Sequence, residues 1–475
     1  MNLRRACVLI AATVMVVGSW GLAADAKVDQ ASGHSGWKAG LSRVVITPEK
    51  PLWMAGYASR NQPAEGKLQD LWVKVLALQD PQGRRAVLVT ADLLGFPKTI
   101  YENIAAQLKS RHELGRDQFL LTASHTHCGP VLRESLFDCY ALSEERIADI
   151  EAYSRELERK TVTAIGEALA RLRPVTLWAV EGKCTFAVNR RNNKEAEVPQ
   201  LQEAGTPLEG PVDHSVPVLA VREVEGPADS AEATRPGKLL AVVFGYSCHN
   251  TTLNFYQWCG DYAGFAQAEL EKRWPQTQAM FWEACGADQN PLPRRKVELA
   301  ERYGRMLAEG VAAALEKPMR PVAPRVRTAF EFVPLAYEST PTEARLKEAA
   351  ESQQMLLRRW GQRMLRQLEQ GQEFPKSYPC PVTVWRLGDQ LLIAMGGEVV
   401  VDYALNFKRR FGPTTWVAGY SNDVFAYIPS KRVWEEGGYE SGSFTVYGLP
   451  AERWAGDIEE RLTAAVERLV KDTSR

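Results

Sequence analysis

One pattern recurs along most of this chain: an apolar, β-branched run ends in small or polar residues, and an amphipathic helix follows. The run 85–91 ends at Asp92 and precedes a predicted helix over 98–111. The run 119–123 leads through a loop to a long predicted helix over 144–172. Strands that alternate with helices predict an α/β fold, a mixed sheet with helices packed on its faces. Because polar residues gather where the runs end, we expect active-site residues at the C-terminal ends of the strands.

The pattern continues towards the C-terminus. Further strands are predicted at 239–245, 279–282, 391–395 and 415–418, and further helices from 262, over 296–315 and over 454–469. A charged helical stretch over about 342–370 interrupts the pattern, and we interpret it as an insertion on the surface. We therefore expect one domain over residues 37–475.

The N-terminus differs from the rest of the chain. Arg4 and Arg5 precede an apolar stretch over about 6–22, and an Ala-x-Ala exit follows at 24–26. This order is typical of a secretory signal peptide, so residues 1–26 are expected to be removed on export. A membrane anchor is the alternative, but the apolar run is short for a membrane span. We expect the mature protein to be secreted or periplasmic.

The charge balance argues against some classes of partner. Lys+Arg and Asp+Glu are both 58, and no long block of one sign stands out. The chain therefore shows no nucleic-acid-binding stripe and no polybasic membrane patch, so any contact with a membrane surface is expected to be transient. No obligate protein partner is evident from the sequence.

The cysteines define no disulfide framework. Of the eight, Cys7 leaves with the predicted signal peptide, and export permits disulfides among the other seven. Because that number is odd, at least one cysteine is expected to be unpaired. No CxxC occurs in the sequence, which argues against a structural zinc knuckle.

Three of the six histidines directly follow predicted strands. A strand directs alternate side chains to one face, so His125 and His127 are expected to aim at one point, and His249 follows the strand at 239–245. Three converging neutral imidazoles form the usual core of a catalytic zinc site. The remaining histidines lack such a context and are interpreted as structural: His34, His112 and His214.

Carboxylates follow other predicted strands. Glu398 comes after a strand and two glycines, where a half-buried charge needs a partner or a metal, so it is a candidate ligand. Asp92, Asp261 and Asp288 hold similar positions. Each of the three is either a carboxylate that orients an imidazole or an ordinary helix N-cap.

His125-Thr126-His127-Cys128-Gly129-Pro130 resembles the His-Thr-His-Ser-Gly-Pro signature of the neutral/alkaline non-lysosomal ceramidases. The resemblance extends over nearly all of residues 40–450 through Thr47-Pro48, Gly56-Tyr57, Asn189-Arg190, His249, Cys259-Gly260-Asp261, Gly397-Glu398 and the stretch from Tyr427 to Gly442. It implies a zinc ion held by His125, His127, His249, Glu398 and Tyr427. Without the resemblance, Tyr427 would be interpreted as a packing aromatic.

The resemblance also implies catalytic roles. Tyr439 matches a second family tyrosine and is the candidate donor to the developing oxyanion, while Arg190 is a polar contact in the pocket. In the expected mechanism zinc lowers the pKa of a water towards ~7 and polarises the scissile carbonyl, which the resulting hydroxide attacks. Asp261 and Asp288 are the candidates that protonate the leaving amine.

Two features depart from the family pattern. Gly286-Ala287-Asp288-Gln289-Asn290-Pro291 stands where the family has Gly-Asp-x-Ser-Pro-Asn, so the family serine has no counterpart and Gln289 or Asn290 is expected to fill its space. The chain ends at Arg475, so the family's immunoglobulin-like C-terminal domain is not expected. Both departures bear on the substrate more than on the zinc chemistry.

The sequence therefore predicts an exported zinc-dependent amidohydrolase that cleaves the N-acyl amide of a ceramide-like lipid. One alternative is a zinc hydrolase of another small-molecule amide or ester, and a second is a catalytically inactive, metal-containing binding protein. A third is a two-metal phosphoesterase, but such sites recruit several bridging carboxylates. The predicted ligand set contains three histidines and a single glutamate, which argues for one zinc.

Overall fold

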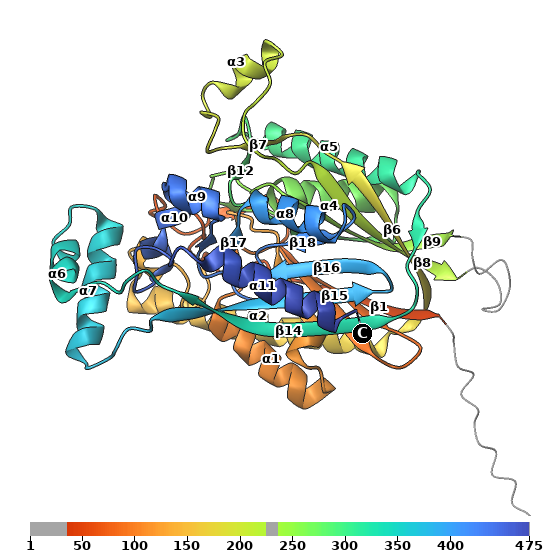
Figure 1. Cartoon of the computed structure of the whole chain (residues 1–475), viewed down its shortest axis with the longest axis horizontal. Coiled ribbons are helices and arrows are strands. Elements are labelled where there is room, and N and C mark those ends of the chain that lie inside the picture. Colours follow the sequence, from red (N-terminus) through yellow and green to blue (C-terminus); the bar gives the residue numbers. More distant parts are fainter. Residues whose placement is uncertain (1–35, 225–235, 475) are drawn as a thin grey trace, which may run out of the picture. The chain divides into compact units, whose positions relative to one another are not determined.

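Two β-sheets pack face to face, and helices cover the outer face of each (Figure 1). The computed structural model describes residues 36–224 and 236–474. The predicted signal peptide over 1–26 lies outside these residues. Among the described residues no helix combines the length and the apolar character that a bilayer crossing requires.

The main sheet is mixed. Its strands are, in spatial order, β11 (Gln278–Glu283), β9 (Pro236–Tyr246), β8 (Ser215–Val224), β6 (Arg173–Lys183), β1 (Trp37–Val45), β3 (Trp72–Gln79), β4 (Arg85–Ala91) and β5 (Phe119–Ala123), with β13 (Arg320–Pro321) paired to β6. The pairs β11–β9 and β4–β5 are parallel, whereas the others are antiparallel. The parallel pairs lie at the two ends of the sheet, and each is followed by residues of the candidate site.

The second sheet is also mixed. It consists of β14 (Val326–Ala336), β15 (Ser377–Leu387), β16 (Gln390–Met395) and β18 (Trp416–Ala418), in that spatial order. The pair β16–β18 is parallel and the other pairs are antiparallel. Three short pairs connect loops around the sheets: β2 (Gly66–Lys67) with β10 (Gln257–Trp258), β7 (Ala187–Asn189) with β12 (Gln289–Pro291), and β17 (Glu398–Val399) with β19 (Tyr427–Ile428).

Helices complete a four-layer arrangement. The outer face of the main sheet carries α1 (Lys98–His112), α2 (Glu144–Ala170), α4 (Asp261–Arg273) and α5 (Val297–Leu315). The outer face of the second sheet carries α8 (Val401–Phe411) and α11 (Ile458–Asp472). The remaining described helices are α3 (Val198–Glu203), α6 (Glu343–Ala350), α7 (Met355–Glu369), α9 (Lys431–Glu436) and α10 (Tyr439–Gly442), with 3-10 turns η1 (Arg116–Gln118), η2 (Phe137–Cys139) and η4 (Phe444–Tyr447). In Figure 1 α6 and α7 extend from one end of the layers.

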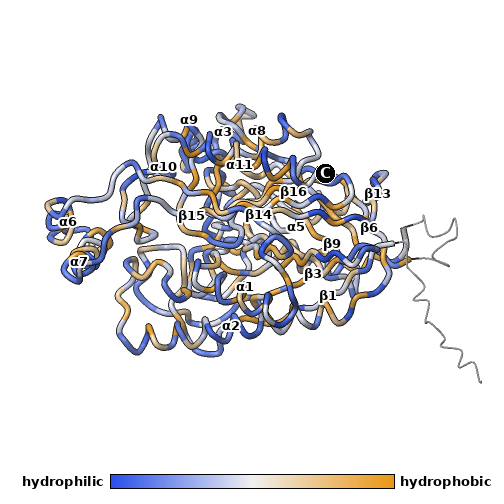
Figure 2. Tube along the Cα trace, turned by 60° about the horizontal axis from the view of Figure 1, so that its bottom comes forward, coloured by the Kyte–Doolittle hydropathy of each residue, from blue (hydrophilic) through white to orange (hydrophobic). Residues whose placement is uncertain are grey.

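The period-two alternation of the strands explains the layers. In β3, Val73 and Val75 pack against the helices, whereas Leu76 and Leu78 face the second sheet. Large tryptophans fill the space between the sheets: Trp282, Trp385 and Trp416. Figure 2 shows the hydrophobic residues gathered along the strands. The predicted α/β class with a mixed sheet is confirmed, but one face of the main sheet is covered by a second sheet rather than by helices.

All seven cysteines within residues 36–224 and 236–474 are buried and unpaired: Cys128, Cys139, Cys184, Cys248, Cys259, Cys285 and Cys380. The expectation of at least one unpaired cysteine is confirmed, and all seven are in fact unpaired. In this fold the thiols act as small apolar side chains, which is the common role of a buried free cysteine.

Candidate metal centre

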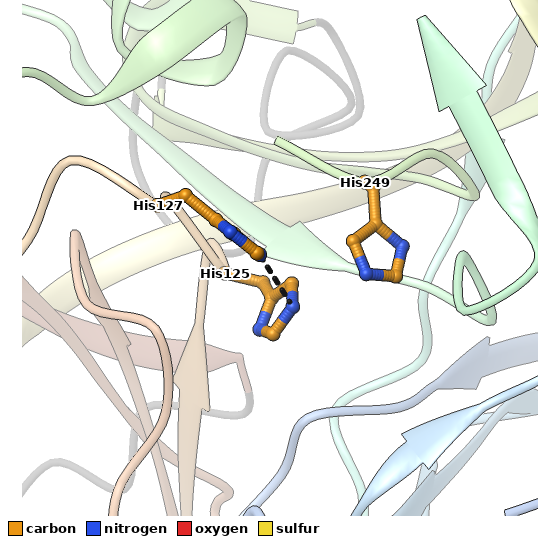
Figure 3. Close-up of side chains that lie close together, drawn as sticks. All are labelled: His125, His127 and His249. Carbon is orange, nitrogen blue, oxygen red and sulfur yellow. Dashed lines mark hydrogen bonds between the residues drawn. The ribbon is translucent and has the colours of Figure 1, made fainter. Parts of the chain in front are cut away.

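Three histidines converge where strands of the main sheet end. His125 and His127 follow β5, and His249 follows β9 (Figure 3). One ring nitrogen from each lies within 4.8 Å of those of the other two, and all three side chains are buried. The strand β5 ends at Ala123 and His125 has φ 57, so a left-handed turn, and not the alternation of an extended strand, brings His125 and His127 together.

Main-chain carbonyls fix the tautomers of two of the rings. Nδ1 of His125 lies 2.6 Å from the carbonyl oxygen of Leu94, and Nδ1 of His249 lies 2.7 Å from that of Gly286. A carbonyl only accepts, so each Nδ1 carries the proton and each Nε2 presents a lone pair. Nε2 of His127 lies 3.3 Å from Nε2 of His125, so all three rings turn a nitrogen towards one point.

Glu398 adds an oxygen to the same point. Its Oε2 lies 3.3 Å from Nε2 of His125 and 3.0 Å from Nε2 of His249. Oε2 of Glu398 and Nε2 of His249 are buried, and neither has a hydrogen-bond partner in the described part of the chain. Acceptors that face one another in a buried site repel unless a cation lies between them. The donor set therefore fits a metal ion.

The protonation states agree with this interpretation. Burial lowers the pKa of His127 well below its usual range and that of His249 to about 4, so both rings are neutral near pH 7. Burial opposes ionisation of Glu398, whereas a positive charge that faces its carboxylate, on the imidazoles of His125 and His249 or on a metal ion in that place, holds the pKa of the carboxyl well below the usual range. Neutral imidazoles with an ionised carboxylate are the states in which these groups bind zinc.

Tyr427 lies beside Glu398 because of strand pairing. In the parallel pair β17–β19, Glu398 and Tyr427 are register partners. The ring of Tyr427 stacks on His249 with centroids 6.4 Å apart and planes 13° apart. Nη2 of Arg190 donates to the Tyr427 hydroxyl over 3.3 Å. The structure thus places the four predicted ligands His125, His127, His249 and Glu398 together, with Tyr427 next to them.

Arg190 and Tyr439 form one wall of the site. The Arg190 guanidinium donates through Nε to Glu440 over 2.8 Å, and it lies over the rings of Tyr427 and Tyr439. Tyr439 packs edge-on against Tyr427, with centroids 5.3 Å apart, and is 55% exposed. Beside them lies a cleft of about 540 Å³, lined mainly by polar and charged residues that include Arg191, Arg294 and Glu436.

The two amides that the sequence offers in place of the family serine, Gln289 and Asn290, have different partners. Oδ1 of Asn290 accepts from Nη1 of Arg190 and from the Thr251 hydroxyl, each over 3.4 Å, and Asn290 lines the cleft. The Gln289 side chain donates instead to the carbonyl of Pro211 over 3.3 Å. Of the two candidates, Asn290 is therefore the one that reaches the site wall.

The three aspartates bind main-chain amides. Asp261 accepts from the N–H groups of Leu253 and Tyr262, and its pKa is raised to about 6 by burial. Asp92 accepts from the N–H of Trp72 and Asp288 from that of Val401. The imidazoles of His125 and His249 are oriented by carbonyl groups and not by these carboxylates, which hold the loops and helix starts instead.

Sequence reasoning did not identify three side chains beside the ligands, of which Tyr420 and Glu283 are buried and Tyr447 is partly buried. Tyr420 lies against His125 with ring centroids 4.3 Å apart, and Glu283 closes β11 and accepts from Asn250 over 3.4 Å. The Tyr447 hydroxyl donates to Oε1 of Glu398. Glu283 ends β11 and Tyr420 closely follows β18, and active-site residues are expected at such strand ends, so both could have been predicted from the sequence. Tyr447 lies in a 3-10 turn, where no local sequence pattern indicates a functional residue.

Comparison with known proteins identifies relatives of this arrangement. Residues 37–292 match the family model described as neutral/alkaline non-lysosomal ceramidase, N-terminal. A stretch of 100 residues is 32% identical to neutral ceramidase 1 of Arabidopsis thaliana, and it spans 20% of the present chain and 13% of that protein.

Solved structures share the fold. The crystal structure of neutral ceramidase from Pseudomonas aeruginosa superposes with a TM-score of 0.66 at 18% identity, covering 91% of this chain and 75% of that one. A ceramidase complexed with C2 gives a TM-score of 0.65 at 17% identity and covers 91% and 76%. At these identities the superpositions establish the common fold.

Proposed function

The chain belongs to the neutral/alkaline non-lysosomal ceramidase family, and from this premise we propose that it is an exported, zinc-dependent amidohydrolase that cleaves the N-acyl amide of a ceramide-like lipid. The observation that carries the proposal is the convergence of His125 Nε2, His249 Nε2 and Glu398 Oε2 on one buried point without a proton donor between them. His127 and Tyr427 complete the proposed ligand set.

The ligands present the chemistry that a catalytic zinc needs. When bound, zinc acts as a Lewis acid on a carbonyl and lowers the pKa of water to near neutrality. The two main-chain carbonyls at Leu94 and Gly286 hold His125 and His249 in the tautomer that binds through Nε2. Burial keeps these rings in place and excludes bulk water from the ligand atoms.

Of the two wall residues, Tyr439 acts on the substrate carbonyl and Arg190 positions Tyr427. Tyr439 is half-exposed at the edge of the site, where its hydroxyl is the proposed donor to the developing oxyanion. A single such donor contributes about 3 kcal/mol in comparable sites. Arg190, held by Glu440 and Asn290, keeps its positive charge beside Tyr427 and positions the phenol.

A second candidate function has its own support. The cleft beside Tyr439 is lined largely by charged side chains, with Arg191, Lys194 and Arg294 among them. A polar cleft favours a smaller amide or ester with a polar head group over a long lipid. A zinc hydrolase of such a substrate is therefore the alternative to a ceramidase, and an inactive, metal-containing binding protein is the third possibility.

Export belongs to the same proposal. The basic start, apolar core and Ala-x-Ala exit over residues 1–26 support cleavage near Ala26 and a secreted or periplasmic mature protein. N-terminal sequencing of protein recovered from the exported fraction tests this step, with Lys27 expected as the first residue.

The proposed activity is tested with a substrate panel. Purified protein is incubated with N-acyl sphingosines, N-acyl amino acids and simple esters, before and after removal of metal by a chelator. We expect release of sphingoid base that chelation abolishes and zinc restores. Hydrolysis confined to the other substrates would replace the lipid assignment, and zinc binding without hydrolysis of any substrate would favour the binding protein.

A further inference from the structure

The two oxygens of Glu398 have different partners. Oε2 faces the imidazoles of His125 and His249, whereas Oε1 accepts a hydrogen bond from the hydroxyl of Tyr447. A carboxylate whose second oxygen is engaged in this way presents a single oxygen to a metal. The Tyr447 hydroxyl therefore fixes both the rotation of the Glu398 carboxylate and the oxygen that points at the histidines.

The ring of Tyr447 is itself held by aromatic and apolar contacts. It packs edge-on against Tyr427, with centroids 6.2 Å apart and planes 78° apart. It also packs against an apolar cluster that includes Trp53, Leu94 and Leu136. Tyr447 thus contacts one proposed ligand through its hydroxyl and a second through its ring.

The turn that carries Tyr447 is anchored by α7. Nε1 of Trp360 donates to the carbonyl of Leu449 over 2.9 Å, and Nη2 of Arg363 donates to that of Gly448 over 3.0 Å. Nε of Arg363 also binds both carboxylate oxygens of Asp138, over 3.1 and 3.0 Å. The hydrogen bonds from Trp360 and Arg363 fix the position of the segment that directly follows Tyr447. The charged stretch over 342–370, interpreted from the sequence as a surface insertion, is therefore connected to the metal centre.

We infer that Tyr447 is a positioning residue for Glu398 and that α7, through Trp360 and Arg363, holds Tyr447 in place. This inference rests on the proposed function, because it requires that Glu398 binds a metal. Groups that orient a metal ligand typically change metal affinity by about 10- to 100-fold when they are removed.

The matched variants are Tyr447→Phe and Tyr337→Phe. Both remove a hydroxyl from a ring that packs in the apolar cluster around Trp454, but the Tyr337 hydroxyl has no partner in the described part of the chain. We expect Tyr447→Phe to weaken zinc binding about 10- to 100-fold in competition with a chelator and to alter the visible absorption spectrum of the cobalt-substituted protein. Tyr337→Phe is expected to keep the wild-type affinity and spectrum.

The role of α7 is tested with Arg363→Gln. It removes the bonds to Gly448 and Asp138, and we expect a smaller loss of zinc affinity in the same direction. The unfolding temperature of each metal-free variant separates this effect from misfolding. Wild-type zinc affinity and cobalt spectrum in Tyr447→Phe would overturn the positioning role, and unchanged affinity in Arg363→Gln would overturn the role of α7. A wild-type protein that binds no zinc would instead refute the proposed function.

Discussion

Gly56 lies directly against the imidazole of His127. A methyl group at Gly56 would stand 2.3 Å from Nδ1 and 2.5 Å from Cγ of that ring, and Gly56 has φ 99. Both the space and the backbone conformation therefore require glycine. This contact gives a physical reason for the Gly56-Tyr57 motif, because the proposed ligand His127 occupies its place only if residue 56 has no side chain.

Gly56→Ala is expected to displace His127 and to weaken zinc binding at least about tenfold, because the ring or the turn must move to admit the methyl group. The measurement is zinc affinity by competition with a chelator. Gly66→Ala is the control, because a methyl group there meets no atom within 4 Å. Equal zinc affinity in both variants would contradict the packing argument.

Tyr439→Phe is expected to lower kcat about 10²- to 10³-fold, while KM and zinc content stay close to wild type. The reason is that the hydroxyl is proposed to act on charge that develops only in the transition state. Steady-state kinetics on the best substrate of the panel provides the measurement. Tyr303→Phe serves as control, because that hydroxyl donates to the carbonyl of Pro293. A loss that appears in KM alone would assign Tyr439 to substrate binding.

Asp423 is expected to make the protein less stable at higher pH. Burial raises the pKa of its carboxyl to about 7, although the Tyr378 hydroxyl donates to it over 2.7 Å. Between about pH 4 and pH 7 the folded state therefore holds a proton that the unfolded state has lost, so stability falls as pH rises through this window, by roughly 4 kcal/mol.

The amide side chain in Asp423→Asn cannot ionise, so the stability of this variant is expected to lack this dependence on pH. Urea unfolding at about pH 4.5 and pH 7.5 measures the difference, and the variant should gain stability relative to wild type as pH rises. A constant difference between the two proteins over this range would show that Asp423 is ionised in the fold.

The buried cysteines are expected to be unreactive in the native protein. Burial raises the pKa of Cys128 and Cys139 to about 12 and that of Cys285 well above the usual range, so little thiolate is available. A thiol reagent added to folded protein should give almost no signal, and unfolding in urea should expose all seven thiols. Fewer thiols in the unfolded protein would reveal disulfides and contradict the structure.

Local patterns in the sequence predicted much of this fold. The run 85–91 is the strand β4 at the same boundaries, and the helix expected over 98–111 is α1 at Lys98–His112. The helix expected over 144–172 is α2, which begins at Glu144 with Ser143 as its cap. These elements carry their own signals: a continuous apolar run, a 3.6-residue stripe and a capping residue.

The second sheet and its contacts could not be predicted in this way. Its strands β14 and β15 pair with each other, and their packing on the main sheet depends on side chains such as Trp385 that meet partners hundreds of residues away. The pairing of Glu398 with Tyr427 and the bond from Tyr447 to Glu398 are likewise non-local. The resemblance to a family indicated Tyr427, but nothing in the sequence marked Tyr447.

Metal analysis of purified protein shows whether the buried histidines and Glu398 hold one zinc ion. We expect about one equivalent of zinc per wild-type chain and a near-complete loss in a His125→Ala/His127→Ala double variant that remains folded. Zinc well below stoichiometric levels in the wild type, or an unchanged content in the double variant, would mean that these side chains do not hold the metal.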